Sequence, residues 1–277
     1  MKYFTNILFA ILASLFISKT LLADGHSGSF DFHTGWSGDV TAMQVAEGHI
    51  MGTGNFVGAT FNDSGSGYLH NGEAQCFAAF DKYMSAPEVA AENLEVDFFA
   101  VQQNGWDDST HGISWYFLDE DQYAKSGLIY TTSEAGREFR KTMNDIGAEI
   151  ISDTLTVHSV GVTLAGDATT NRVTLRWSHE VTDPAKFLPL WTKFAKSIEG
   201  YDWSANAYGL QSHYLGNNGN GISHEIWASF NSSQDALKFL SGMYGSAEFA
   251  KFSPQANKYS KFKRSYMEVS LKQYNPD

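Results

Sequence analysis

Hydrophobic and polar positions along this chain of 277 residues follow two different periods. Between Phe30 and Phe80, short runs of alternating character are separated by turns rich in Asn, Asp and Gly, a pattern typical of antiparallel hairpins. The runs are DVTAMQV, HIMGTGNFVGATF and EAQCFAAF. Residues 24–75 are therefore expected to form a β-rich N-terminal segment, and the last run, residues 73–80, is also expected to be a strand.

From residue 88 onward, the pattern changes to alternating helices and strands. A helical pattern at residues 88–94 precedes two strand-like runs, LEVDFFAV and GISWYFL, then a helical region at about 121–151 and an apolar strand at 156–164. We assign residues 76–165 to a first α/β unit, which ends at a polar linker, residues 166–171.

Residues 171–277 predict a second unit in the order β-α-β-β-α-β, the split βαβ arrangement. The strand VTLRWSHEV leads to Asp183 and Pro184, a helix cap followed by a proline at the first helical position. An Asn-Gly pair at 218–219 predicts the central hairpin. Gly221-Ile222-Ser223 corresponds to Gly112-Ile113-Ser114 in the first unit, so the expected fold class is α+β with tandem ferredoxin-like units.

The Asp183-Pro184 helix start and the segment Ser246-Ala247-Glu248-Phe249 resemble the dimeric α/β-barrel superfamily, which includes antibiotic-biosynthesis-monooxygenase-like domains. The resemblance implies that two units in one chain close a pseudo-dimeric α/β barrel with an internal cavity. That superfamily spans cofactor-independent oxygenases, haem-handling enzymes, isomerases and cyclases, so the fold alone does not select a reaction. The N-terminal segment instead resembles a small secreted lipocalin-like barrel. In the alternative to the tandem-unit fold, residues 30–118 form a separate β-barrel.

The first 23 residues have the features of an export signal. Lys2 precedes the apolar run at residues 7–17, and small residues end at Ala23. The run is shorter than the roughly 20 residues that a membrane span needs. We expect cleavage after Ala23 and a periplasmic or extracellular protein without membrane insertion.

The charge limits which partners the chain can bind, and the cysteine content limits its covalent links. A formal charge of −12 disfavours nucleic-acid binding, which requires a basic surface. Cys76 is the one cysteine of the chain, so no intrachain disulfide is possible. A small molecule is the expected partner, while the oligomeric state stays open.

Three histidines are candidates for catalysis or metal binding. A turn at Asn218-Gly219 would place His213 opposite His224 across the hairpin, and His179 would join them at one rim of the sheet. Three imidazoles would suit a divalent metal, a haem edge or proton transfer. The alternative is that they are polar residues at strand ends or in a wet cavity.

Four aromatic residues are candidates for the cavity wall, namely Trp177, Tyr208, Tyr214 and Trp227. Tyr208, Tyr214 and Trp227 are expected on the sheet face opposite the histidines. They would bind an apolar or planar ligand, and the alternative is an ordinary sheet-to-helix core.

Three functions remain open on these grounds. The first is an exported protein that binds a small apolar or planar ligand. The second is an enzyme, either a cofactor-independent monooxygenase or isomerase or a metal- or haem-dependent one, with the cofactor unknown. The third is a structural or interaction module.

Overall fold

The computed structural model describes residues 50–57, 71–103, 111–146, 148–164, 170–216 and 220–275. The expected export signal and most of the lipocalin-like segment expected in residues 24–75 lie outside these ranges. No helix within them is both long enough and apolar enough to cross a membrane.

In the described part of the chain, eight antiparallel strands close a barrel in the spatial order β1-β3-β2-β8-β5-β7-β6-β4. The first half of the chain contributes β1 (Ile50–Val57), β2 (Glu95–Gln102), β3 (His111–Phe117) and β4 (Glu149–Thr163). The second half contributes β5 (Val173–Val181), β6 (Ala207–Leu215), β7 (His224–Phe230) and β8 (Ser260–Tyr274). Pairing of β2 with β8 and of β4 with β6 joins the halves.

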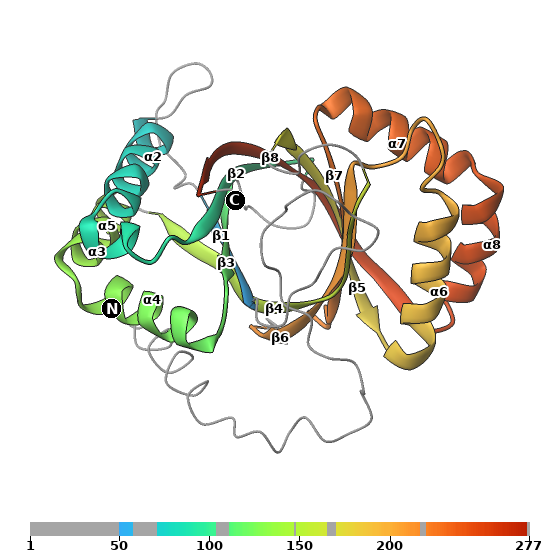
Figure 1. Ribbon diagram of the computed structural model, residues 1–277, viewed down its shortest axis with the longest axis horizontal. Coiled ribbons are helices and arrows are strands. Elements are labelled where there is room, and N and C mark those ends of the chain that lie inside the picture. Colours follow the sequence, from blue (N-terminus) through green and yellow to red (C-terminus); the bar gives the residue numbers. More distant parts are fainter. Residues whose placement is uncertain are drawn as a thin grey trace.

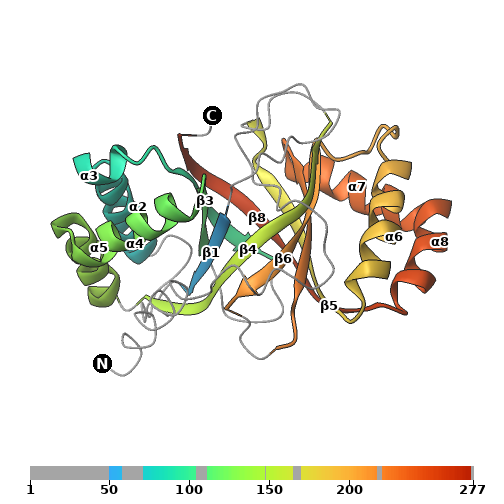
Figure 2. The same cartoon turned by 60° about the horizontal axis from the view of Figure 1, so that its bottom comes forward.

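Helices cover the barrel on two opposite sides, as Figure 1 shows. One layer contains α2 (Asn71–Met84), α3 (Pro87–Ala90), α4 (Glu120–Thr132) and α5 (Glu134–Asp145), and the other α6 (Pro184–Ser197), α7 (Ser233–Gly245) and α8 (Ala247–Ala256). The view in Figure 2 separates the same two layers with the strands between them. The strands and helical segments of each half follow the order β-α-β-β-α-β.

Side-chain caps explain where several helices begin. Asp183 accepts a hydrogen bond from the Lys186 amide, with Pro184 at the first helical position, as the sequence predicts. Ser133 and Ser246 cap α5 and α8 in the same way, and each also ends the preceding helix. These serines therefore break each long helical region into two.

The prediction of a strand at residues 73–80 is wrong, because these residues belong to α2. Cys76, Phe80, Tyr83 and Met84 are buried at a spacing of four, three and one, which is the period of one helix face. The alternative of a separate β-barrel in residues 30–118 is also wrong, since β1 and β2 pair with β4 and β8 of the common barrel.

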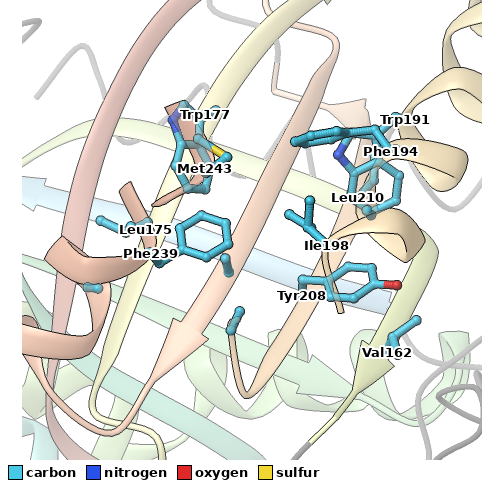
Figure 3. Packing of buried hydrophobic residues seen from close by; sticks show 14 of the residues in the cluster. Val162, Leu175, Trp177, Trp191, Phe194, Ile198, Tyr208, Leu210, Phe239 and Met243 are labelled. Atoms are coloured by element: carbon cyan, nitrogen blue, oxygen red, sulfur yellow. The ribbon is translucent and has the colours of Figure 1, made fainter. Parts of the chain in front are cut away.

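Two apolar cores lie outside the barrel wall, one under each helical layer. In the first half, Phe80 of α2 packs its ring 5.6 Å from Phe98 of β2 and 5.7 Å from Phe139 of α5. In the second half, the core lies between β5, β7 and β6 and the helices α6, α7 and α8, and Figure 3 shows its side chains. The barrel interior is polar instead.

Candidate functional site

A pocket of about 310 Å³ lies in the second apolar core, between the outer face of the barrel wall and helices α6, α7 and α8. Figure 3 shows the side chains of this region, including Trp177, Trp191, Phe194, Tyr208, Phe239 and Met243. Its lining is mostly aromatic and aliphatic. This size and character are typical of small-molecule sites.

Strand register explains which residues reach the pocket. Alternate residues of a strand share one face, and Leu175 of β5 pairs with Ala228 of β7, which pairs with Tyr208 of β6. Trp177, two residues after Leu175, is therefore on the same outer face. Small residues leave the space among these large rings, because the lining includes Ala195, Ala205, Ala228 and Ala256.

His179 follows Trp177 on the same face and brings an imidazole into the pocket. Its ring lies 5.8 Å from the rings of both Phe187 and Phe262. Burial lowers the pKa of His179 to about 4, so the imidazole is uncharged at neutral pH. Its Nδ1 has no hydrogen-bond partner among the described residues. An uncharged imidazole with a free nitrogen can accept a proton or ligate a metal.

A second polar group lies on the pocket wall near the end of α6. The hydroxyl of Tyr208 donates a hydrogen bond of 2.5 Å to Oε1 of Glu199. Burial and this bond raise the pKa of Tyr208, so the phenol keeps its proton. Nearby, the hydroxyl of Ser204 donates to the carbonyl of Ile198. These side chains make one region of an otherwise apolar wall polar.

The structure does not bring the three predicted histidines together. His224 pairs with Ser212 rather than His213, so the predicted register of the hairpin is wrong by one residue. His179 does pair with His224 across β5 and β7. The one-residue shift turns His213 into the barrel, with its Nε2 3.8 Å from Glu225. Within the described ranges, no three His, Cys, Asp or Glu side chains are grouped to hold a metal.

The four predicted aromatic residues have different surroundings. Trp177 and Tyr208 line the pocket, and Trp227 also borders it. The Trp227 side chain belongs to the inner face, because Trp227 pairs with Arg176 and Gly209. Tyr208 is thus on the face of His179 rather than opposite it. Tyr214 is 45% exposed and is not part of the pocket lining.

Sequence reasoning missed a cluster of charged and polar side chains inside the barrel. Glu225 accepts hydrogen bonds from Ser178 Oγ at 2.7 Å, Gln211 Nε2 at 3.1 Å and Tyr266 OH at 3.3 Å. Arg176 Nη1 lies 3.8 Å from the same carboxylate. Thr174, Arg176 and Ser178 alternate with apolar residues in β5, and this alternation was the available signal.

Three carboxyl groups of this interior have perturbed pKa values. Burial raises the pKa of Glu268 to about 7 and that of Asp97 to about 6. Burial also opposes ionisation of Glu225, but His213, Arg176 and Arg264 outweigh it and lower its pKa. Glu225 therefore stays ionised, while Glu268 and Asp97 titrate near neutral pH.

Comparison with known proteins gives structural neighbours only. No protein-family model and no curated protein matches the sequence. The putative monooxygenase from Fusobacterium nucleatum subsp. nucleatum ATCC 25586 is 12% identical, with a TM-score of 0.56 over 82% of this chain and 94% of that chain. The one from Lactobacillus acidophilus NCFM is 12% identical, with a TM-score of 0.52 over 83% and 97%.

An anthrone oxidase-like protein is also similar, at 8% identity, with a TM-score of 0.55 over 85% of this chain and 95% of that chain. These neighbours belong to the dimeric α/β-barrel superfamily. At such low identity the likeness concerns the fold: an α+β protein with a curled antiparallel sheet, as in dimeric α/β barrels.

Proposed function

We propose that this protein is an enzyme that oxygenates a planar, largely apolar small molecule without a metal or organic cofactor. The observation that carries the proposal is the apolar pocket of about 310 Å³ into which His179 brings an uncharged imidazole. A pocket that combines an apolar wall with a perturbed titratable group is a typical candidate active site. The export signal expected in residues 1–23 would place this enzyme outside the cytoplasm.

The chemistry requires a substrate with an acidic carbon-hydrogen bond. His179 takes one proton from a ring methylene, and the resulting carbanion is delocalised over the aromatic system. A low pKa makes His179 a weak base, but a bound anion beside the imidazolium raises that pKa as the proton moves. Exclusion of water by the aromatic wall strengthens this attraction.

Dioxygen then acts as the oxidant. Two electrons of the carbanion form a carbon-oxygen bond, giving a peroxide after protonation. Loss of water converts the peroxide to a ketone, so that one methylene and one dioxygen give one carbonyl and one water. The proton held by His179 and the second methylene proton both end in that water.

Haem is the cofactor that the wider superfamily suggests, and the pocket lining argues against it. His179 could bind the haem iron, since its Nδ1 is without a partner among the described residues. However, the lining in the described part of the chain includes no lysine or arginine to neutralise two propionates. The residues present therefore fit an uncharged planar ligand better.

We also propose that the two halves are tandem copies of one ancestral unit. Their common element order and the shared Gly-Ile-Ser segments support this interpretation. The copies differ at the pocket, since the first half has Phe80, Phe98 and Trp115 packed closely at the corresponding sheet face. On this proposal one copy is specialised for stability and the other for ligand binding.

Anthrone is a suitable test substrate because it is a planar tricycle with an acidic methylene. We expect the purified protein to convert anthrone to anthraquinone with uptake of one dioxygen per product, above the rate of a protein-free blank. The His179→Gln variant should lower kcat by at least about 100-fold. His111→Gln, a change in the first half where the ring stacks 6.0 Å from Phe98, is the matched control.

Two results would reject the proposal. Turnover that persists in His179→Gln would remove His179 from the chemistry. Binding of anthrone, detected as a rise in Tm, without any product would make the protein a ligand carrier instead.

A further inference from the structure

Two polar features of the pocket, His179 and the Tyr208-Glu199 pair, lie apart along the strand direction. His179 is four residues along β5 from Leu175, whose row across the sheet contains Ala228 and Tyr208. At about 3.3 Å per residue, His179 and the Tyr208 row are separated by roughly 13 Å along the strand direction. A ligand that reaches His179 with one end can therefore meet the Tyr208-Glu199 pair with the other.

The free hydrogen-bonding groups at the Tyr208-Glu199 end of the pocket are acceptors. The hydroxyl proton of Tyr208 is used in the 2.5 Å bond to Glu199 Oε1, and the hydroxyl proton of Ser204 is used in the bond to Ile198. What remains are acceptors, namely the lone pairs of the two hydroxyl oxygens and Oε2 of Glu199. A ligand carbonyl or ether would find no donor among these groups.

We infer that Glu199 and Tyr208 select ligands that carry a hydroxyl or amino group at the end remote from His179. This inference rests on the proposed function, because it takes the same pocket as the ligand site. A ligand hydroxyl donates to Glu199 Oε2 or to the Tyr208 oxygen, and a hydrogen bond to a carboxylate is stronger than one between neutral groups. Replacing that hydroxyl by a methoxy group leaves the acceptors unsatisfied, which costs affinity.

Three naphthalenes that differ in one substituent provide the test: 2-naphthol, 2-methoxynaphthalene and 2-acetonaphthone. Their Kd values are measured by isothermal titration calorimetry with the full chain. We expect 2-naphthol to bind at least about tenfold more tightly than 2-methoxynaphthalene. Glu199→Gln, which removes the carboxylate acceptor, should reduce this ratio to near one.

Glu199→Gln has a second expected effect that loss of folding cannot produce. Its amide nitrogen turns a free acceptor into a donor, so 2-acetonaphthone should bind more tightly than it does to the unaltered protein. Glu248→Gln is the matched control, because Glu248 accepts a hydrogen bond from Tyr201 at an exposed site outside the pocket lining. This variant should keep the original ratio.

The outcomes distinguish a failure of the selectivity assigned to Glu199 and Tyr208 from a failure of the proposed function. Equal affinities for 2-naphthol and 2-methoxynaphthalene, or a preference that survives Glu199→Gln, would overturn selection by Glu199 and Tyr208 while His179-dependent turnover of anthrone still stood. If none of the three naphthalenes and no anthrone binds the folded protein, the pocket is not the ligand site and both proposals fail.

Discussion

Arg176 Nε lies 2.8 Å from Glu268 Oε2 inside the barrel, and both side chains are almost completely buried. Arg176 also approaches Glu225, so one guanidinium lies between two carboxyl groups. Asp97, on the neighbouring strand β2, accepts a hydrogen bond from Ser270 Oγ at 2.6 Å. The interior thus places three carboxyl groups around a single fully buried arginine, with Arg264 at its edge.

This arrangement predicts that stability decreases as pH rises through neutrality. The pKa values of Glu268 and Asp97 are raised, to about 7 and about 6, so these two groups bind more protons in the folded protein than in the unfolded chain between about pH 4 and 7. Their stabilisation is complete below the unfolded values and is lost as pH rises through the folded ones. The raised pKa of Glu268 contributes on the order of 3 kcal/mol to the free energy of unfolding at acidic pH.

Glu225, which lies beside these carboxyl groups, limits the stability of the folded protein in acid. The pKa of Glu225 is lowered, so its contribution is present at neutral pH and is lost when it becomes protonated in strong acid. Tyr116 and Tyr266 have raised pKa values and stay neutral over this range. His179 and His224 act in the opposite direction, because burial lowers their pKa values to about 4 and their contribution to stability grows as pH rises toward about 6.5. A net loss of stability is therefore expected above about pH 6.5.

The measurement is chemical denaturation at about pH 6.5 to 8 for the unaltered protein and for Glu268→Gln, a range in which His179 and His224 are uncharged in both the folded and the unfolded state. The variant carries a permanently neutral group, so its free energy of unfolding should vary less with pH, and it should be the more stable of the two at pH 8. Glu248→Gln, at a half-buried position of α8 whose partner Tyr201 is exposed, serves as the control and should leave the slope unchanged. A steeper slope in Glu268→Gln would contradict this account.

A close contact between backbone and ring predicts that Gly209 cannot be replaced. A Cβ on Gly209 would lie 2.5 Å from the indole of Trp227, which is buried inside the barrel. Gly209→Ala should therefore lower the free energy of unfolding by about 1 to 3 kcal/mol or more. Gly200→Ala adds the same methyl where no atom lies within 4 Å, and it should be nearly neutral. Equal midpoints in urea for the two variants would show that the Trp227 ring moves freely.

The extent to which the sequence predicts this structure depends on the range of the forces involved. The Asp183-Pro184 cap and the second β-α-β-β-α-β unit are local features, and the structure agrees with them. Residues 73–80 fit both periods over eight positions, and only packing of Phe80 against Phe98 and Phe139 selects the helix.

The candidate site shows the same limit. Placement of His213 relative to His224 depended on a single turn residue, and a shift of one position moves a side chain to the other face. The sequence indicates His179 because it lies near the end of its strand, and Trp177 because it is a large aromatic residue of the same strand; the structure places both on the outer face of β5. Glu199 was not identified, since its role depends on contact with Tyr208 across the gap between α6 and β6.

Filling the pocket should separate ligand binding from stability. Ala228 lines the pocket on β7, so the larger side chain of Ala228→Leu would occupy space that the ligand needs. We expect loss of 2-naphthol binding by at least about tenfold, with a Tm equal to or above that of the unaltered protein, because cavity filling adds buried apolar contacts. Ala236→Leu provides the contrast. Ala236 is fully buried in the same core but does not line the pocket, so overpacking there should lower Tm by several degrees. If Ala228→Leu bound 2-naphthol with unchanged Kd, the ligand site would have to lie elsewhere on the protein.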